Sequence, residues 1–135
     1  MAQEIGSQKW YTVTCTAALL DGALKVPVIT PLDPAETYLV RDVRLIGGGT
    51  NFGAGGDRLL DLTDGTTIWT TIANADLETA PSATLTLGNA KVPFLTSKAN
   101  TASVAGAKIY FAYSGGTTDH STGSITFHVC LTRLT

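Results

Sequence analysis

Apolar and polar residues alternate in two segments, one near each end of the chain. In residues 10–17, every second position is apolar, and the positions between them hold a tryptophan and three threonines. In residues 124–133, isoleucine, phenylalanine, valine and leucine take every second position, starting with Ile125. A period of two is typical of strands in a sheet that buries one face. We therefore predict a strand in each segment.

Five segments between them also have the composition of strands, at 23–29, 37–46, 58–63, 66–72 and 107–114. In the first, Pro27 cannot donate a ladder hydrogen bond, which predicts an edge strand. In the second, strict alternation places Arg41 on the same face as Leu39 and Val43. Residues 83–88 and 91–96 fit short strands or extended loops.

Helical character is confined to residues 73–80, which are followed closely by Pro81. About eight short strands separated by glycine and proline turns favour an all-β fold. We predict a single-domain antiparallel β-sandwich, jelly-roll-like, with at most one short helix. A length of 135 residues suits one domain. The domain is expected to span residues 1–135, with residues 1–8 as an N-terminal arm.

The dipeptide Asp64-Gly65 separates two of the strand segments. Such a pair between alternating segments is a strong signal for a hairpin with a type I′ turn, in which both central residues have positive φ. A two-residue loop pairs Leu62 with Thr67 and Leu60 with Trp69. A bulge after Gly65 would shift that register.

Low charge changes the picture of the surface. Charged residues make up 15% of the chain, against about 25% in ordinary domains, so other chains are expected to cover much of the surface. The net charge is −2 and the nine basic residues are scattered, which disfavours binding to nucleic acid. No apolar run approaches the roughly 18 residues that span a membrane. With no secretory signal evident at the start, synthesis in a cytoplasm is expected, with Cys15 and Cys130 as free thiols.

Two glycine-rich loops are the candidate contact sites. Six glycines fall within residues 47–56, but the third glycine of a dinucleotide fingerprint is replaced by Phe52, and no Walker lysine follows. Residues 114–123 form a second loop of the same plan. We interpret both as protein-contact loops, with tolerated surface loops and ligand binding as alternatives. The predicted contact residues are Thr50, Asn51, Phe52, Thr117, Thr118, Asp119 and His120, with Phe52 as an exposed anchor.

No pattern of catalytic or metal-ligating residues stands out. The chain has no G-x-S-x-G elbow and no group of donors at metal-ligand spacing. We therefore expect neither an enzyme nor a cofactor or metal site. The aromatic residues Trp10, Trp69 and Tyr110 could stack on sugars, although aromatics in strands more often serve the core.

Two segments of the chain resemble small virion proteins of tailed bacteriophages: GGGTNFGAGGDRLLDLTDGTTIW and YSGGTTDHSTGSITFHV. The similar part runs from about Tyr38 to Arg133. The shared features are the glycine-rich loop, the Asp57-Arg58 pair that opens a strand, the Asp64-Gly65 turn and the later Ser-Gly-Gly-Thr-Thr-Asp. The resemblance implies a structural role, as a capsid decoration (cement) protein, a head fibre or a tail module, and it supplies no catalytic residues.

The sequence therefore leaves two candidate functions. The first is a decoration protein of the virion surface, made in the host cytoplasm, whose partners are the major capsid protein and copies of itself, as a homo-oligomer and most simply a trimer. The second is a glycan- or receptor-binding module of a head fibre or tail tip, with Trp69 or Tyr110 as the stacking platform.

Overall fold

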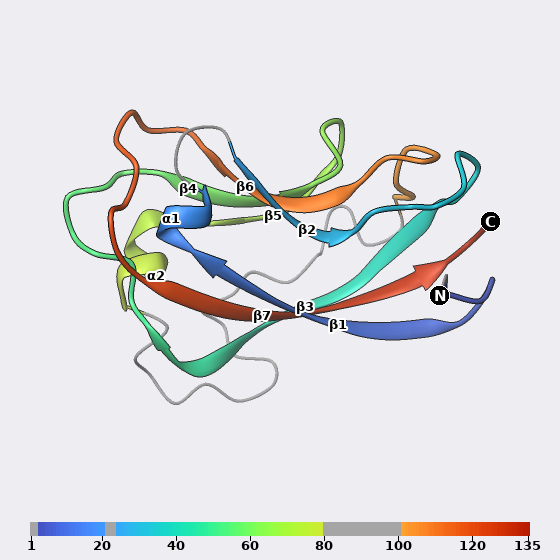
Figure 1. Cartoon of the computed structure of the whole chain (residues 1–135), viewed down its shortest axis with the longest axis horizontal. Coiled ribbons are helices and arrows are strands. Elements are labelled where there is room, and N and C mark those ends of the chain that lie inside the picture. The colour runs from blue at the N-terminus through green and yellow to red at the C-terminus, as the bar shows by residue number, and fades with distance from the viewer. Residues whose placement is uncertain (1–2, 21–23, 80–100) are drawn as a thin grey trace.

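The computed structural model describes residues 3–20, 24–79 and 101–135, which form seven strands and two short helical segments (Figure 1). In chain order these are β1 (Gln8–Thr16), α1 (Ala17–Leu20), β2 (Lys25–Ile29), β3 (Tyr38–Thr50), β4 (Leu59–Thr63), β5 (Ile68–Ile72), α2 (Asn74–Thr79), β6 (Ile109–Ser114) and β7 (Ser124–Arg133). The segments predicted at 83–88 and 91–96 lie outside the described residues.

The strands form two antiparallel sheets that face each other (Figure 1). One sheet has the order β1-β7-β3 and the other has the order β2-β6-β4-β5. The chain passes repeatedly from one sheet to the other, as in a jelly roll. An antiparallel bridge between Leu39 and Ala102 extends the three-stranded sheet beyond β3. The prediction of an all-β antiparallel sandwich is confirmed.

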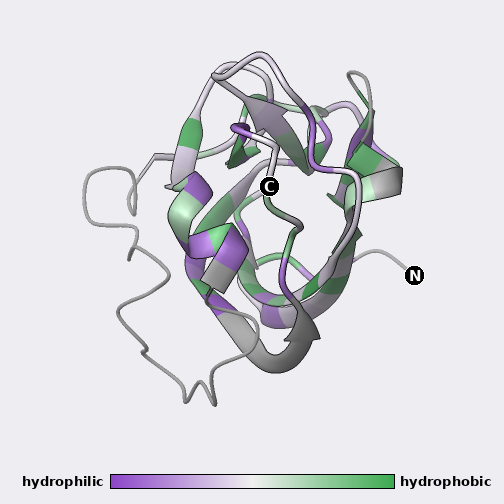
Figure 2. Ribbon diagram, turned by 90° about the vertical axis from the view of Figure 1, so that its left-hand side faces the viewer, coloured by the Kyte–Doolittle hydropathy of each residue, from purple (hydrophilic) through white to green (hydrophobic). Residues whose placement is uncertain are grey.

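The core lies between the two sheets and follows the predicted alternation. Along the strands in Figure 2, hydrophobic and hydrophilic bands alternate. Ile125, Phe127 and Leu131 of β7 are buried, as their period of two predicts. The rings of Phe111 and Phe127 stack across the core with their centroids 4.6 Å apart. Cys15 and Cys130 are free and buried, and burial raises the pKa of both thiols.

A β-bulge in β3 corrects the predicted faces of that strand. The pairing with β7 shifts register between Val40 and Asp42, so Arg41 has no partner in the ladder. Val40 is buried before the bulge and Val43 after it, while Arg41 is exposed. The prediction that Arg41 shares a face with Leu39 and Val43 is therefore wrong. One extra residue resets the alternation and turns the charged side chain to solvent.

The described part of the N-terminal arm is folded against the end of β7. The side-chain amide of Gln3 donates to the carbonyl oxygens of Ser7, at 2.6 Å, and Leu131, at 2.9 Å. The backbone N–H of Gly6 donates to the carbonyl of Arg133 at 2.7 Å. The arm is thus held by its own chain.

The turn after β4 is wider than a type I′ turn. Gly65 has a φ of 94°, but no non-glycine residue among those described has positive φ, so Asp64 does not meet the type I′ requirement. The Asp64 carboxylate accepts the N–H groups of Thr66 and Thr67, at 2.9 and 2.7 Å, which closes a four-residue loop.

The register of the hairpin differs from the predicted one as a consequence. Thr63 pairs with Ile68, and beyond a bulge at Trp69 the observed pairs are Leu62 with Thr70 and Leu60 with Ile72. The predicted pairs of Leu62 with Thr67 and Leu60 with Trp69 are wrong, because the loop that the Asp64 side chain closes has four residues and not two.

Gly65→Val should lower the free energy of unfolding by about 1–2 kcal/mol, because a β-branched residue is strained at positive φ. The added Cβ would also lie 3.4 Å from the Tyr110 hydroxyl. Thr66→Val, in the same turn but without positive φ, is the matched control for thermal unfolding. Equal melting temperatures for the two variants would contradict the turn geometry.

Candidate functional site

The two glycine-rich loops meet at one end of the sandwich. We call residues 51–57 and 115–123 the glycine-loop end. The N–H of Gly53 donates to the carbonyl of Thr122 at 3.0 Å, and the N–H of Asp57 donates to that of Thr118 at 2.9 Å. Thr50, the last residue of β3, pairs with Ser124 at the base of the loops. The structure therefore brings the two sets of predicted contact residues together.

Charged side chains of the Asp57-Arg58 pair hold the second loop in place. The guanidinium of Arg58 donates to the Asp119 carboxylate at 2.6 Å and to the carbonyls of Gly115 and Gly116 at 2.9 and 3.2 Å. The Asp57 carboxylate accepts the N–H groups of Thr117 and Thr118, the next two residues of that loop. The pair thus has a structural role in ordering the loop.

Phe52 is buried and is not the exposed anchor that the sequence suggests. It is 1% exposed, and its ring centroid lies 5.3 Å from that of His120 and 6.3 Å from that of Tyr113. His120 is buried too, with Nδ1 3.0 Å from the Gly53 carbonyl oxygen. The prediction of Phe52 as a surface contact is wrong, because the loop turns its ring into the core.

Glycines permit this close packing of the two loops. A Cβ on Gly123 would lie 2.6 Å from the Cα of Phe52, and a Cβ on Gly56 would lie 2.6 Å from the His120 ring. Real Cβ atoms do not come so close to their neighbours, so side chains are excluded at both positions. What the glycine-loop end exposes is small and polar, as at Gly55, Thr117 and Thr118, with Asn51 and Asp119 half-buried.

Acid should destabilise the wild-type protein more than an Asp57→Asn variant. The N–H groups of Thr118 and Thr117 donate to Asp57 Oδ1 at 2.7 and 2.8 Å, which lowers the pKa of this carboxyl below its ordinary value of 3.8. A lowered pKa stabilises the fold above the pKa of the unfolded chain, and this contribution is lost as the pH falls through the folded value.

Urea unfolding of both proteins between about pH 5 and about pH 2 measures this difference, since the contribution of Asp57 disappears within that range. The wild type should lose more of its free energy of unfolding than Asp57→Asn. Parallel pH profiles would contradict the loop-capping role of Asp57.

The opposite end of the sandwich carries exposed apolar side chains, a feature that sequence reasoning missed. We call residues 3–7, 30–37, 101–107 and 133–135 the terminal end. Backbone hydrogen bonds join these segments, including Leu134 to Thr37 at 2.9 Å and Gly106 to Glu36 at 2.8 Å. Its exposed large apolar residues are Ile5, Leu32, Val104 and Leu134, with 67%, 80%, 47% and 38% of their surface exposed.

Buried Glu36 fixes the loop that carries Leu32. The Tyr38 hydroxyl donates to Glu36 at 2.6 Å, and the N–H of Asp33 donates to it at 3.2 Å. The guanidinium of Arg133 lies 3.9 Å from the same carboxylate. Burial, followed by the hydrogen bond from its hydroxyl to Glu36, raises the pKa of Tyr38. The apolar side chains of the terminal end therefore project from an ordered frame.

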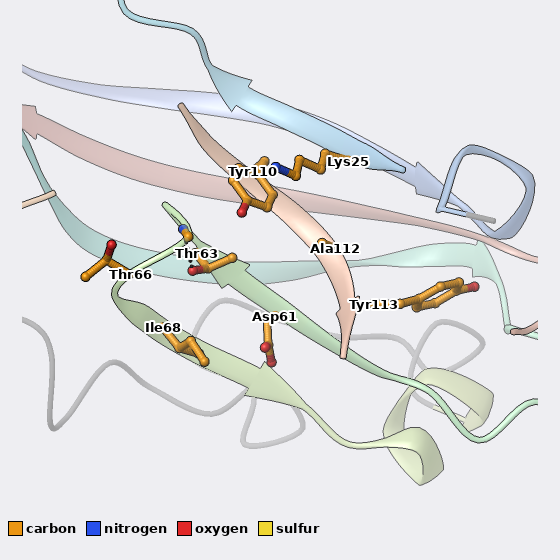
Figure 3. A pocket seen from close by; sticks show the side chains of 9 residues that line it. Lys25, Asp61, Thr63, Thr66, Ile68, Tyr110, Ala112 and Tyr113 are labelled. Atoms are coloured by element: carbon orange, nitrogen blue, oxygen red, sulfur yellow. Dashed lines mark hydrogen bonds between the residues drawn. The ribbon is translucent and has the colours of Figure 1, made fainter. Parts of the chain in front are cut away.

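A pocket of about 350 Å³ opens on the outer face of the four-stranded sheet (Figure 3). Its lining residues are Lys25, Asp61, Thr63, Gly65, Thr66, Ile68, Tyr110, Ala112 and Tyr113. Tyr110, one of the two predicted stacking platforms, lines the pocket, with the Lys25 ammonium 4.5 Å from its ring centroid. Trp69, the other, is buried and donates to the Thr101 carbonyl at 3.1 Å, so it offers no open platform.

Comparison of the chain with models of protein families, with curated proteins and with solved structures gives no match. The ranges that the structure describes contain no group of three or more histidine, cysteine or carboxylate side chains placed to hold a metal ion. Neither of the described helices has the length and apolar character needed to cross a membrane.

Proposed function

We propose that this chain is a capsid decoration protein of a tailed bacteriophage. In this proposal it binds the outer surface of the head as a homo-oligomer, a trimer in the simplest case, and stabilises the shell without catalysing a reaction. The observation that carries the proposal is the terminal end, where two loops and the two ends of the chain present Ile5, Leu32, Val104 and Leu134 to solvent. The resemblance to phage virion proteins names the partner, the major capsid protein.

The apolar composition of the terminal end supports contact with protein. Large apolar side chains gathered on one surface are typical of interaction sites, and the buried centres of interfaces are more apolar than their rims. Leu32, with 80% of its surface exposed, has the most area to bury. The fixed Glu36 frame limits the conformational entropy that binding would cost.

Stabilisation of the shell follows from mass action. A protein that binds the assembled shell but not its separated subunits lowers the free energy of the assembled state as its own concentration rises. The function then requires complementary surfaces and no reactive group. The small polar surface around Thr117 and Thr118 remains a second predicted contact, between neighbouring decoration subunits.

Leu32→Ser should weaken binding to undecorated heads by roughly 5- to 150-fold, the range expected for an interface anchor worth about 1–3 kcal/mol. Leu24→Ser is the matched control, because Leu24 is also exposed but precedes β2, whereas Leu32 follows it. Co-sedimentation of the protein with purified heads gives both affinities. Failure of the wild type to saturate bare heads, or equal losses in the two variants, would contradict the proposal.

A further inference from the structure

One row of cross-strand pairs on the outer face of the four-stranded sheet places Lys25, Ala112 and Asp61 side by side in the pocket. Lys25 of β2 pairs with Ala112 of β6, Ala112 pairs with Asp61 of β4, and Asp61 pairs with Thr71 of β5. The small side chain of Ala112 thus leaves a hollow between a cationic and an anionic residue (Figure 3). Adjacent strands are about 4.8 Å apart, so the backbones of Lys25 and Asp61 are about 10 Å apart.

The Asp61 carboxylate has unused hydrogen-bonding capacity in this hollow. Asp61 is only 7% exposed, and its Oδ1 accepts the Thr71 hydroxyl at 2.7 Å. That is the one hydrogen bond its side chain makes within the described part of the chain. The second oxygen of Asp61 is not among the buried polar atoms that lack a partner. It is therefore open to water, or to a donor from a ligand that enters the pocket.

The opposite wall of the hollow supplies a donor instead of an acceptor. The Lys25 ammonium lies over the Tyr110 ring and, among the residues that the structure describes, pairs with no carboxylate. Because Lys25 covers this face of the ring, Tyr110 holds the ammonium in position and does not offer that face for stacking. Among the other lining residues, Ile68 is apolar and Thr66 carries a hydroxyl.

We propose that this pocket binds a neutral saccharide through a pyranose ring. Ring hydroxyls would donate to Asp61 and accept from Lys25, while the C–H surface of the ring would lie against Ile68 and Ala112. An anionic ligand would be repelled by Asp61, and a simple amine would leave Lys25 unused. A volume of about 350 Å³ suits a ligand of about one or two pyranose rings.

Titration of the ¹⁵N-labelled full chain with methyl glucopyranoside, methyl galactopyranoside, methyl mannopyranoside, N-acetylglucosamine and maltose tests the proposal. At least one sugar should shift the amide resonances of Asp61 and Ala112 saturably, with a Kd on the order of 1 mM. Absence of such shifts with every sugar at about 50 mM, well above that Kd, would overturn the proposal.

Two variants make the site assignment specific. Asp61→Asn keeps an acceptor for the Thr71 hydroxyl but removes the charge, and it should weaken sugar binding at least roughly tenfold. Asp42→Asn, on the outer face of the other sheet, should bind sugar as the wild type does. Equal affinities in Asp61→Asn and the wild type would overturn the proposal, as would saturable shifts with n-butylammonium but with no sugar. Binding of Asp61→Asn to phage heads is expected to be unchanged, so this test is independent of the decoration role.

Discussion

Phe52→Ala should lower the free energy of unfolding by about 3–5 kcal/mol, the usual cost of removing a buried phenylalanine side chain. The ring is 1% exposed and packs beside His120 and Tyr113, where the two glycine-rich loops meet. The adjacent glycines leave little freedom for collapse, because the backbone at Gly123 already lies against Phe52. A cavity would therefore remain in place of the ring.

Chemical denaturation of Phe52→Ala and Leu32→Ala separates burial from exposure. Leu32 is 80% exposed, so its truncation should change the free energy of unfolding by less than about 0.5 kcal/mol. Phe52→Ala should thus reduce folding stability, whereas Leu32→Ala should reduce head binding. An unchanged melting temperature for Phe52→Ala would show that the ring faces solvent in solution.

Asp64→Ala should be the second most damaging substitution, with a loss of about 2–3 kcal/mol. Besides the N–H groups of Thr66 and Thr67, the Asp64 carboxylate accepts the N–H of Val104 at 2.8 Å. Removing it leaves three backbone donors without their acceptor and detaches the hairpin turn from the terminal end. Water can reach part of the turn, which limits the loss.

Asp33→Ala is the matched control for Asp64→Ala. Asp33 is exposed and accepts the single N–H of Ala35 at 2.8 Å, so its truncation should cost clearly less. Urea unfolding gives the stability of both variants, and hydrogen exchange at Val104 should accelerate only in Asp64→Ala. Equal stabilities would contradict the role of Asp64 as the link between the turn and the terminal end.

The sandwich was predictable because alternation is a local signal. The first and last strands, β1 and β7, keep a period of two over several residues, and this period fixes which of their side chains reach the core. The bulge in β3 was less visible, although the spacing of Val40 and Val43 around Arg41-Asp42 is the trace that it leaves in the sequence. The turn at Asp64 was predicted wrongly because an Asp-Gly pair fits both a two-residue type I′ loop and a four-residue loop. The hydrogen bonds from the N–H groups of Thr66, Thr67 and Val104 to the Asp64 carboxylate accompany the four-residue loop, and Val104 is distant in sequence.

The candidate sites were harder to predict because they depend on contacts distant in sequence. Composition singled out two similar loops, which lie together in the structure, but their mutual packing buries Phe52 and His120, which no local pattern indicates. The pocket depends on cross-strand register, which places Lys25 and Asp61 on either side of Ala112. The terminal end joins two loops and the two ends of the chain, and single apolar residues outside regular strands carry no periodic signal.

A cryo-electron microscopy map of heads mixed with the purified protein tests the central claim most directly. We predict ordered density on the outside of the shell, in symmetric groups of three copies, with Leu32 and Ile5 of the terminal end against the capsid subunits and the glycine-loop end away from them. Heads without added density, or copies bound with the terminal end facing solvent, would contradict the proposed function.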